Sequence, residues 1–205
     1  MTALRHFLLA LQFFTRIPVT GRLAAWVGYS PAMLHASSAH FPGVGWVVGG
    51  VAALVMAGAL AWLPAGPLGA RVAAVLATIA TVWITGAFHE DGLADTADGL
   101  GGGLTRERAL EIMKDSRIGS YGTVALLLAL VLKVALLALI AQRGAWPAAA
   151  ALLAAHALSR LAPLVVMRSL PYVSDAAHAK AKPIAEAVTG RGFGIGCLWS
   201  IPALA

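Results

Sequence analysis

The sequence predicts an all-α, polytopic integral membrane protein: a helical bundle with a cytoplasmic acidic loop and helix region. Hydrophobic residues make up 60% of the 205 residues and charged residues only 12%, whereas soluble proteins average about 45–50% and about 25%. The mean hydropathy of +0.81 agrees with this composition. Because such a chain has too little polar surface to cover a core in water, a soluble globular fold is excluded.

Four segments are long enough to span a hydrocarbon core about 30 Å thick, which takes about 20 helical residues. They cover residues 44–63, 71–88, 121–141 and 147–167. The spans follow one another without a linker or repeat, so we expect one membrane-embedded domain over residues 1–205.

Two further apolar runs are too short to span. Residues 4–15 are followed by Arg16 and lack a cleavage site, which favours a short interfacial or half-buried helix over a signal peptide. A last run begins near Gly192, and the chain ends inside it at Ala205. We expect this run to be re-entrant or truncated.

The charges on the connections predict the orientation. If the N-terminal arm and the loops 89–120 and 168–191 share one side, that side holds eleven of the fifteen Lys and Arg residues. The opposite side holds only Arg71 and Arg143, so the positive-inside rule places the loop 89–120 in the cytoplasm and the chain in the cell inner membrane. The scattered basic residues thus serve as topology signals in the lipid bilayer, and no nucleic-acid partner is expected. The eleven are Arg5, Arg16, Arg22, Arg106, Arg108, Lys114, Arg117, Arg168, Lys180, Lys182 and Arg191.

Acidic residues are concentrated in one stretch. Seven of the nine lie between residues 90 and 115. Asp91, Asp95 and Asp98 stand at i, i+4 and i+7, which places them on one face of an α-helix. Three like charges repel one another unless a cation joins them, and hard carboxylate oxygens select Mg²⁺, Mn²⁺ or Ca²⁺. We therefore expect a metal site on these three aspartates, with Glu90, about 100° away around the helix, as a weaker candidate ligand.

Groups suited to binding phosphate follow the acidic stretch. Lys114, Ser116 and Arg117 precede the span that begins near residue 121, and amides at a helix N-terminus together with Lys and Arg bind anions. His89 borders the acidic residues at the membrane edge. Arg160 lies inside a span, where a charge is costly, and it can clamp a phosphate through two hydrogen bonds.

Between these groups, residues 105–115 show an amphipathic helical pattern. Arg108, Glu111 and Asp115 share a stripe on it at i, i+3 and i+7. A solvated, salt-bridged face is the simpler interpretation of Arg106, Glu107 and Arg108.

The motifs FHEDGLADTADGLGGG (88–103) and EIMKDSRIGSYG (111–122) resemble the signature of the adenosylcobinamide-GDP ribazoletransferases, also called cobalamin 5'-phosphate synthases. The resemblance extends over nearly the whole chain. The other segments that carry it are LLALQFFTRIPV (8–19), FPGVGWVVGG (41–50), LSRLAPLVVMRSLPYV (158–173) and AKAKP (179–183).

The resemblance implies the last assembly step of the cobalamin nucleotide loop. The enzyme would join adenosylcobinamide-GDP to α-ribazole, or to its 5'-phosphate, and release GMP. Its cofactor would be Mg²⁺ on Asp91, Asp95 and Asp98, and either Asp98 or Asp115 would accept the hydroxyl proton. A homo-oligomer or an association with other enzymes of cobalamin synthesis is compatible with this role.

Other classes fit less well. A CDP-alcohol phosphotransferase would carry D-x-x-D-G-x-x-A-R followed by a second aspartate pair. Here Gly99 follows Asp98, but no Ala-Arg pair and no second aspartate pair follow. A membrane prenyltransferase would need two separated aspartate motifs. A divalent cation transporter would line a pore with acidic residues, whereas Lys133 and Arg160, the charges inside the predicted spans, are positive.

Overall fold

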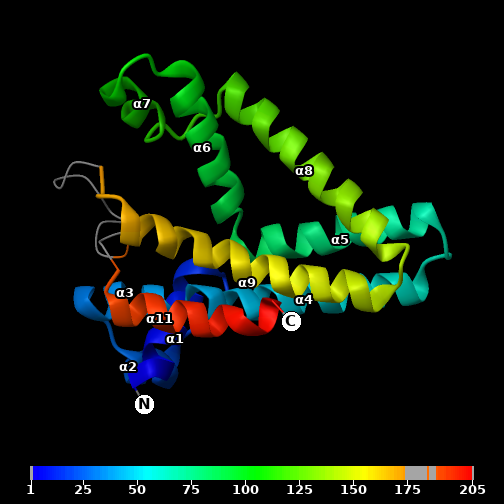
Figure 1. The fold of residues 1–205 in the computed structure, drawn as a ribbon, viewed down its shortest axis with the longest axis horizontal. Coiled ribbons are helices and arrows are strands. Elements are labelled where there is room, and N and C mark those ends of the chain that lie inside the picture. Colours follow the sequence, from blue (N-terminus) through cyan, green and yellow to red (C-terminus); the bar gives the residue numbers. More distant parts are fainter. Residues whose placement is uncertain (1, 174–183, 185–187, 205) are drawn as a thin grey trace. The chain divides into compact units, whose positions relative to one another are not determined.

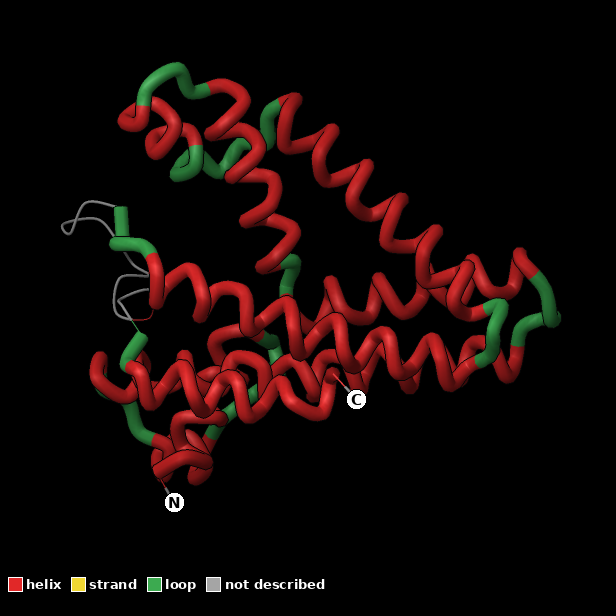
Figure 2. Tube along the Cα trace, viewed as in Figure 1, coloured by secondary structure: helices red, strands yellow, loops and turns green. Residues whose placement is uncertain are grey.

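The computed structural model describes residues 2–173, 184 and 188–204. These residues form helices joined by short loops and contain no strand (Figure 2). Four of the helices are long and apolar enough to cross a membrane. The expected all-α, multi-pass membrane protein is therefore confirmed. The motif at 179–183, with Lys180 and Lys182, lies outside the described residues.

The long helices correspond to the four predicted spans. They are α4 (Phe41–Trp62), α5 (Pro67–Thr85), α8 (Ser120–Ala141) and α9 (Ala145–Ser169). The largest difference is in α5, which we expected over residues 71–88. It begins earlier because Pro67 occupies its first turn, where a missing N–H costs nothing. It ends earlier because Gly86, in the left-handed region with φ 67°, terminates it.

The chain divides into two compact units, residues 1–54 with 148–205 and residues 55–147. Besides parts of α4 and α9, the described residues of the first unit form six shorter elements. They are α1 (Thr2–Phe14), α2 (Gly21–Val27), α3 (Pro31–Ser37), η1 (Ser38–His40), α11 (Gly190–Ser200) and η2 (Ile201–Leu204). The predicted short helix over residues 4–15 corresponds to α1, and the last apolar run forms α11 and η2.

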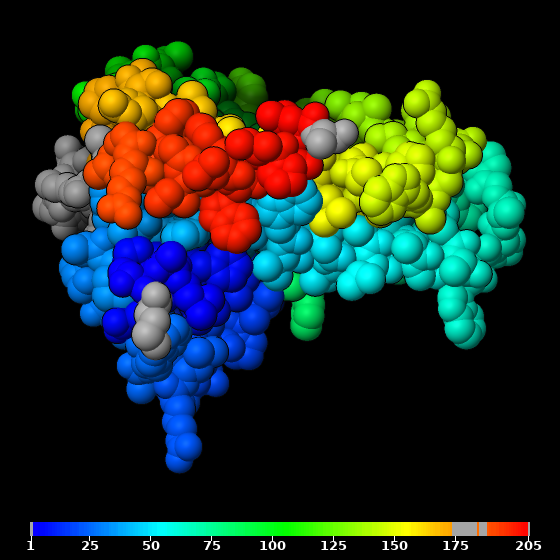
Figure 3. Space-filling model, turned by 60° about the horizontal axis from the view of Figure 1, so that its bottom comes forward, coloured from blue at the N-terminus to red at the C-terminus, as the bar shows by residue number. Residues whose placement is uncertain are grey.

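The two ends of the chain pack together in this unit. The rings of Phe7 and Trp199 stack with their centroids 5.9 Å apart, and the Trp199 Nε1–H donates to His40 Nδ1 at 3.1 Å. In Figure 3, red atoms of the C-terminal segment accordingly lie against blue atoms of the N-terminal segment. In the same unit α4 approaches α9 closely, because a Cβ on Gly45 would overlap the His156 carbonyl oxygen.

In the second unit, α5, α6 (Phe88–Gly102) and α8 form the three sides of a triangle (Figure 1). The short α7 (Arg106–Ile112) packs against α6. Gly86 and Ala87 are both left-handed, with φ 67° and 61°, so the chain turns sharply between α5 and α6. This turn separates the apolar span from the acidic helix that follows it.

Candidate functional site

The acidic stretch is helical, as its spacing predicted. Asp91, Asp95 and Asp98 lie along α6, whose first turn contains Glu90 and Asp91. Carboxylates in this position are stabilised by the positive end of the helix dipole. The three aspartates differ in exposure: Asp91 is exposed, Asp95 is half-buried and Asp98 is 8% exposed.

Asp98 is bound to the N-terminus of α8. Its Oδ2 accepts a hydrogen bond from the Gly119 N–H at 2.7 Å, and its Oδ1 accepts one from the Gly122 N–H at 2.8 Å. A Cβ on Gly119 would lie 2.5 Å from Asp98 Oδ1, and one on Gly122 would overlap Asp98 Oδ2. Glycine at both positions is therefore what lets the carboxylate reach the amides. The anion at this helix end is a side chain of the protein itself, where we expected a substrate phosphate.

The structure consequently does not assemble the expected three-carboxylate metal site. Among the described residues, no three Asp, Glu, His or Cys side chains form a group that could hold a metal ion. Asp91 and Asp95 remain on the open part of the α6 face. Burial, and then the nearby charges of Asp91 and Asp98, raise the pKa of Asp95. A carboxylate under such repulsion gains from a bound cation, so this pair fits a hard divalent metal completed by substrate oxygens.

Glu90, the weaker candidate, has one buried carboxylate oxygen. Its Oε2 has no hydrogen-bond partner in the part of the chain that the structure describes. Consecutive helical side chains point about 100° apart, so Glu90 does not share the face of Asp91 and Asp95. We leave it outside the candidate metal pair.

A pocket of about 360 Å³ opens at the junction of α6, α7 and α8. Charged groups, glycines and one aromatic ring surround it, so it suits a polar ligand that carries a base or another flat group. Asp98 and Gly102, which contribute to its wall, continue the stripe of Asp91 and Asp95 along α6. The lining residues are Asp98, Gly102, Arg108, Glu111, Ile112, Asp115, Arg117, Gly119, Ser120 and Tyr121.

Two ion pairs line this pocket. Arg117 Nη2 donates to Asp115 Oδ2 at 2.6 Å and Arg117 Nε to Asp115 Oδ1 at 3.0 Å. The hydrogen bonds from Arg117 lower the pKa of Asp115 to about 2. Arg108 Nη1 donates to Glu111 Oε2 at 2.7 Å. Such exposed pairs are weak, so a substrate phosphate can compete for both guanidinium groups.

The other predicted phosphate ligands do not line this pocket. Lys114 and Ser116 are exposed in the segment between α7 and α8, and His89 is exposed near the start of α6. Arg160 belongs to the first unit, is 2% exposed, and donates from Nη1 to the His156 carbonyl oxygen at 3.0 Å. Arg160 is therefore bonded within α9, and its expected contact with phosphate stays a prediction.

Sequence reasoning undervalued three residues. Arg108 and Glu111 form an exposed salt bridge, yet they also line the pocket. The stripe that they share with Asp115 was the available signal, because it gives α7 one charged face. Tyr121 carried no such signal. Its ring lies against Gly101, where a Cβ would come within 2.5 Å, so its place in the pocket depends on a contact with another helix.

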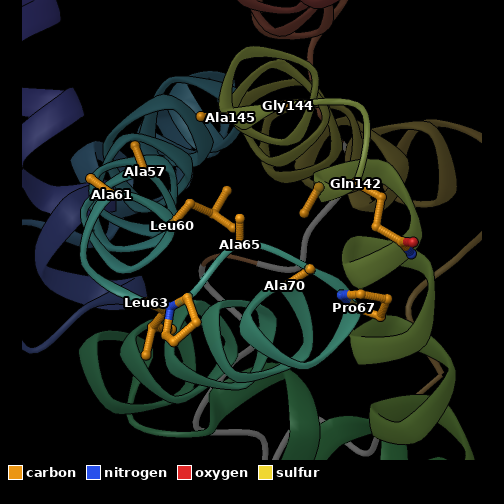
Figure 4. Close-up of a pocket in the computed structure, with 13 residues that line it drawn as sticks. Ala57, Leu60, Ala61, Leu63, Ala65, Pro67, Ala70, Gln142, Gly144 and Ala145 are labelled. Atoms are coloured by element: carbon orange, nitrogen blue, oxygen red, sulfur yellow. The ribbon is translucent and has the colours of Figure 1, made fainter.

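A larger pocket in the second unit offers no comparable chemistry. It has about 520 Å³ and lies by the connections that follow α4 and α8 (Figure 4). Its labelled side chains are small or apolar apart from Gln142, and no titratable residue lines it. Size therefore does not identify the functional site here.

Comparisons with known proteins agree on one family. The family model described as cobalamin-5-phosphate synthase matches residues 6–205. The adenosylcobinamide-GDP ribazoletransferase of Polaromonas naphthalenivorans is 55% identical over 98% of this chain and 77% of its own length. The enzyme of the same name from Albidiferax ferrireducens is 56% identical over 98% of this chain and 72% of its own length. No solved structure matches. The chain belongs to the cobalamin-5-phosphate synthase family.

Proposed function

We propose that this protein is a Mg²⁺-dependent transferase that joins adenosylcobinamide-GDP to α-ribazole, or to α-ribazole 5'-phosphate, and releases GMP. The observation that carries the proposal is the pocket at the α6–α7–α8 junction, whose lining comes from the two motifs 88–103 and 111–122 except for Arg108. Relatives named for this reaction match almost the whole chain. Family membership also favours this function over a CDP-alcohol phosphotransferase or a cation transporter.

In the proposed site, Asp91 and Asp95 hold the metal. When bound, Mg²⁺ neutralises charge on the diphosphate of the substrate and on the departing phosphate. Two carboxylates that share the cation with substrate phosphates form a usual Mg²⁺ site. Burial, and then the charges of Asp91 and Asp98, raise the pKa of Asp95, and a bound cation would favour its ionised form.

The basic groups of the chain bind and orient the diphosphate. Arg117 and Arg108 present guanidinium groups in the pocket, while Lys114, Ser116 and His89 provide exposed donors nearby in the sequence. The 3'-hydroxyl oxygen of α-ribazole forms a bond to the phosphorus attached to cobinamide. The bond from that phosphorus to the GMP oxygen breaks, and GMP leaves.

The hydroxyl proton passes to water in this proposal. A pKa of about 2 makes Asp115 a poor proton acceptor, and both oxygens of Asp98 already accept amide hydrogens. Phosphoryl transfer depends mainly on positioning and charge stabilisation. We therefore assign the proton to neither of the two carboxylates that we considered as the base.

GMP release by the purified full chain in lipid nanodiscs tests the function. Adenosylcobinamide-GDP and α-ribazole are supplied together and singly, with and without Mg²⁺, and the same series is repeated with α-ribazole 5'-phosphate. We expect GMP only when both substrates and the metal are present. Asp95→Asn should abolish release, whereas Glu107→Gln, which removes an exposed charge on α7 away from the pocket lining, should not.

Release from adenosylcobinamide-GDP without any ribazole would indicate a hydrolase and contradict the proposal. Full activity in EDTA would contradict the metal site alone. For the location, we propose the cell inner membrane with the pocket on the cytoplasmic face, as the distribution of Lys and Arg indicates.

A further inference from the structure

We infer that Asp98 is a positioning residue, which clamps α6 to the first turn of α8 and thereby sets the acidic face of α6 relative to the pocket. The inference rests on the proposed function, because it gives Asp98 a role in that same site. It separates Asp98 from its neighbours Asp91 and Asp95, with which it shares a helical stripe.

The contacts of Asp98 are those of a helix cap supplied by another helix. Gly119 is the N-cap residue of α8, and Gly122 lies in its first turn. The amides at both positions have no partner within their own helix, and the Asp98 carboxylate binds one with each oxygen. The negative charge also faces the positive end of the helix dipole. These two bonds satisfy a buried carboxylate that burial would otherwise penalise.

The same end of α6 also holds α7. A Cβ on Gly99 would lie 2.6 Å from Met113 Cγ, and one on Gly103 would lie 2.6 Å from Ala109 Cα. Asp98 and Gly99 are consecutive, so adjacent positions of α6 fix α8 and the α7 segment. The charged stripe of α7 and the start of α8 therefore share one support.

This support fixes the geometry that the reaction needs. Asp95 lies three residues before Asp98, about 4.5 Å along the helix axis, and Arg117 lies two residues before the clamped Gly119. When the hydrogen bonds between Asp98 and the first turn of α8 break, α6 and α8 are no longer held together at this point. The proposed metal ligands then move relative to the Arg117 guanidinium that binds phosphate. Errors of about 1 Å in such positions cost about 100-fold in rate.

Two variants open the clamp from opposite sides. Asp98→Asn keeps one acceptor oxygen, and Gly122→Ala keeps the carboxylate but places a methyl group against it and 2.8 Å from the Ala94 carbonyl oxygen of α6. Gly92→Ala is the matched control, because it adds the same methyl group to α6 where no atom lies within 4 Å. Asp98→Ala removes both acceptors and completes the series.

The full chain in nanodiscs is assayed for kcat, for KM and for the Mg²⁺ concentration that gives half-maximal activity. We expect Asp98→Asn and Gly122→Ala each to lower kcat at least tenfold and to raise the Mg²⁺ requirement, with Asp98→Ala worse than Asp98→Asn. The double variant Asp98→Asn/Gly122→Ala should be no worse than the worse single variant, because both changes break the same contact. Gly92→Ala should resemble the wild type.

A direct role of Asp98 in metal binding or proton transfer gives a different pattern. Gly122→Ala would then stay active, or its effect would multiply with that of Asp98→Asn. Either result overturns the clamp.

Limited trypsin digestion tests the clamp without activity. Arg106, Arg108, Lys114 and Arg117 lie between α6 and α8. We expect trypsin to cut both single variants and the double variant there faster than the wild type and Gly92→Ala. The three variants should be cut at the same rate as one another. Unchanged cleavage would overturn the clamp even in an active protein. If the wild type releases no GMP, the proposed function fails, and the digestion still decides on the clamp.

Discussion

Asp95 and Asp115 show how neighbouring groups set the charge of identical side chains. The pKa of Asp115 falls to about 2 because Arg117 donates hydrogen bonds to the carboxylate. The pKa of Asp95 rises because burial and two other aspartates disfavour its ionised form. Asp115 is thus fully ionised at neutral pH, where it orients a cation. Asp95, by contrast, is the aspartate whose ionised form would be stabilised by a bound metal cation.

Asp115→Asn distinguishes a positioning role from a catalytic base. We expect the KM for adenosylcobinamide-GDP to rise several-fold with little change in kcat, because Arg117 loses the partner that orients it. A general base would contribute about 10²–10⁴-fold to the rate, so a fall in kcat of that size would contradict the positioning role. Because Asp115 loses its charge only as the pH falls towards 2, the wild-type rate should not change with its titration between pH 5 and 8.

Asp95→Asn should separate stability from metal binding. The folded state raises the pKa of Asp95, so its charge costs stability once the pH exceeds that pKa. At pH 7 without metal, the variant should therefore melt at a higher temperature than the wild type. Mg²⁺ should raise the melting temperature of the wild type, because it binds only the folded site, and should leave the variant unchanged. Equal Mg²⁺ shifts in both proteins would place the metal elsewhere.

At the scale of helices, glycine sets how closely two elements pack. Gly45 on α4 faces the backbone of α9, where its added Cβ would lie 2.7 Å from Ala157 Cα. Gly49, one turn later, would place a Cβ 3.0 Å from Leu153 Cα. Small residues at such spacing let membrane helices approach one another. The first unit therefore depends on this glycine face of α4.

Gly45→Ala should destabilise the protein by about 1–3 kcal/mol, the usual cost of overpacking a tight contact. Gly50→Ala, on the same helix, adds its methyl group to open space and should be neutral or slightly stabilising. Thermal unfolding in one lipid mixture compares the two variants. Equal melting temperatures would show that α4 and α9 are not in close contact at Gly45.

The sequence predicts helices better than it predicts the contacts between them. The four spans follow from hydropathy, and the acidic face of α6 follows from spacing, because both depend on local order in the chain. The break at Ala87 could not be foreseen, since alanine carries no preference for the left-handed region. The role of Asp98 was equally hidden, because its partners Gly119 and Gly122 belong to a different helix.

At the scale of the molecule, two exposed tryptophans lie where helices are expected to leave the bilayer. Trp62 is 92% exposed and Trp146 is 76% exposed. They lie at the end of α4 and the start of α9, beside the connections that carry few basic residues. Tryptophan is enriched where a helix leaves the hydrocarbon core. The positions of Trp62 and Trp146 therefore fit a membrane–water interface at these connections.

Cysteine labelling checks the proposed orientation in the bilayer. In a Cys197→Ser background, single cysteines replace the exposed residues Glu107 on α7 and Ala65 between α4 and α5. A membrane-impermeant maleimide should label Glu107→Cys only in inside-out vesicles and Ala65→Cys only in right-side-out vesicles. Labelling of both positions from the same side would overturn the orientation.

The bonds of Asp98 also bear on how the chain enters the bilayer during synthesis. They join positions only 21 and 24 residues apart. All three residues have therefore left the ribosome before most of α8 does. The first turn of α8 can thus be tethered to α6 while the apolar body of the helix is still emerging. A span held at its leading end has only its other end free to cross. One buried carboxylate can therefore contribute to the direction in which α8 inserts, in addition to the basic residues.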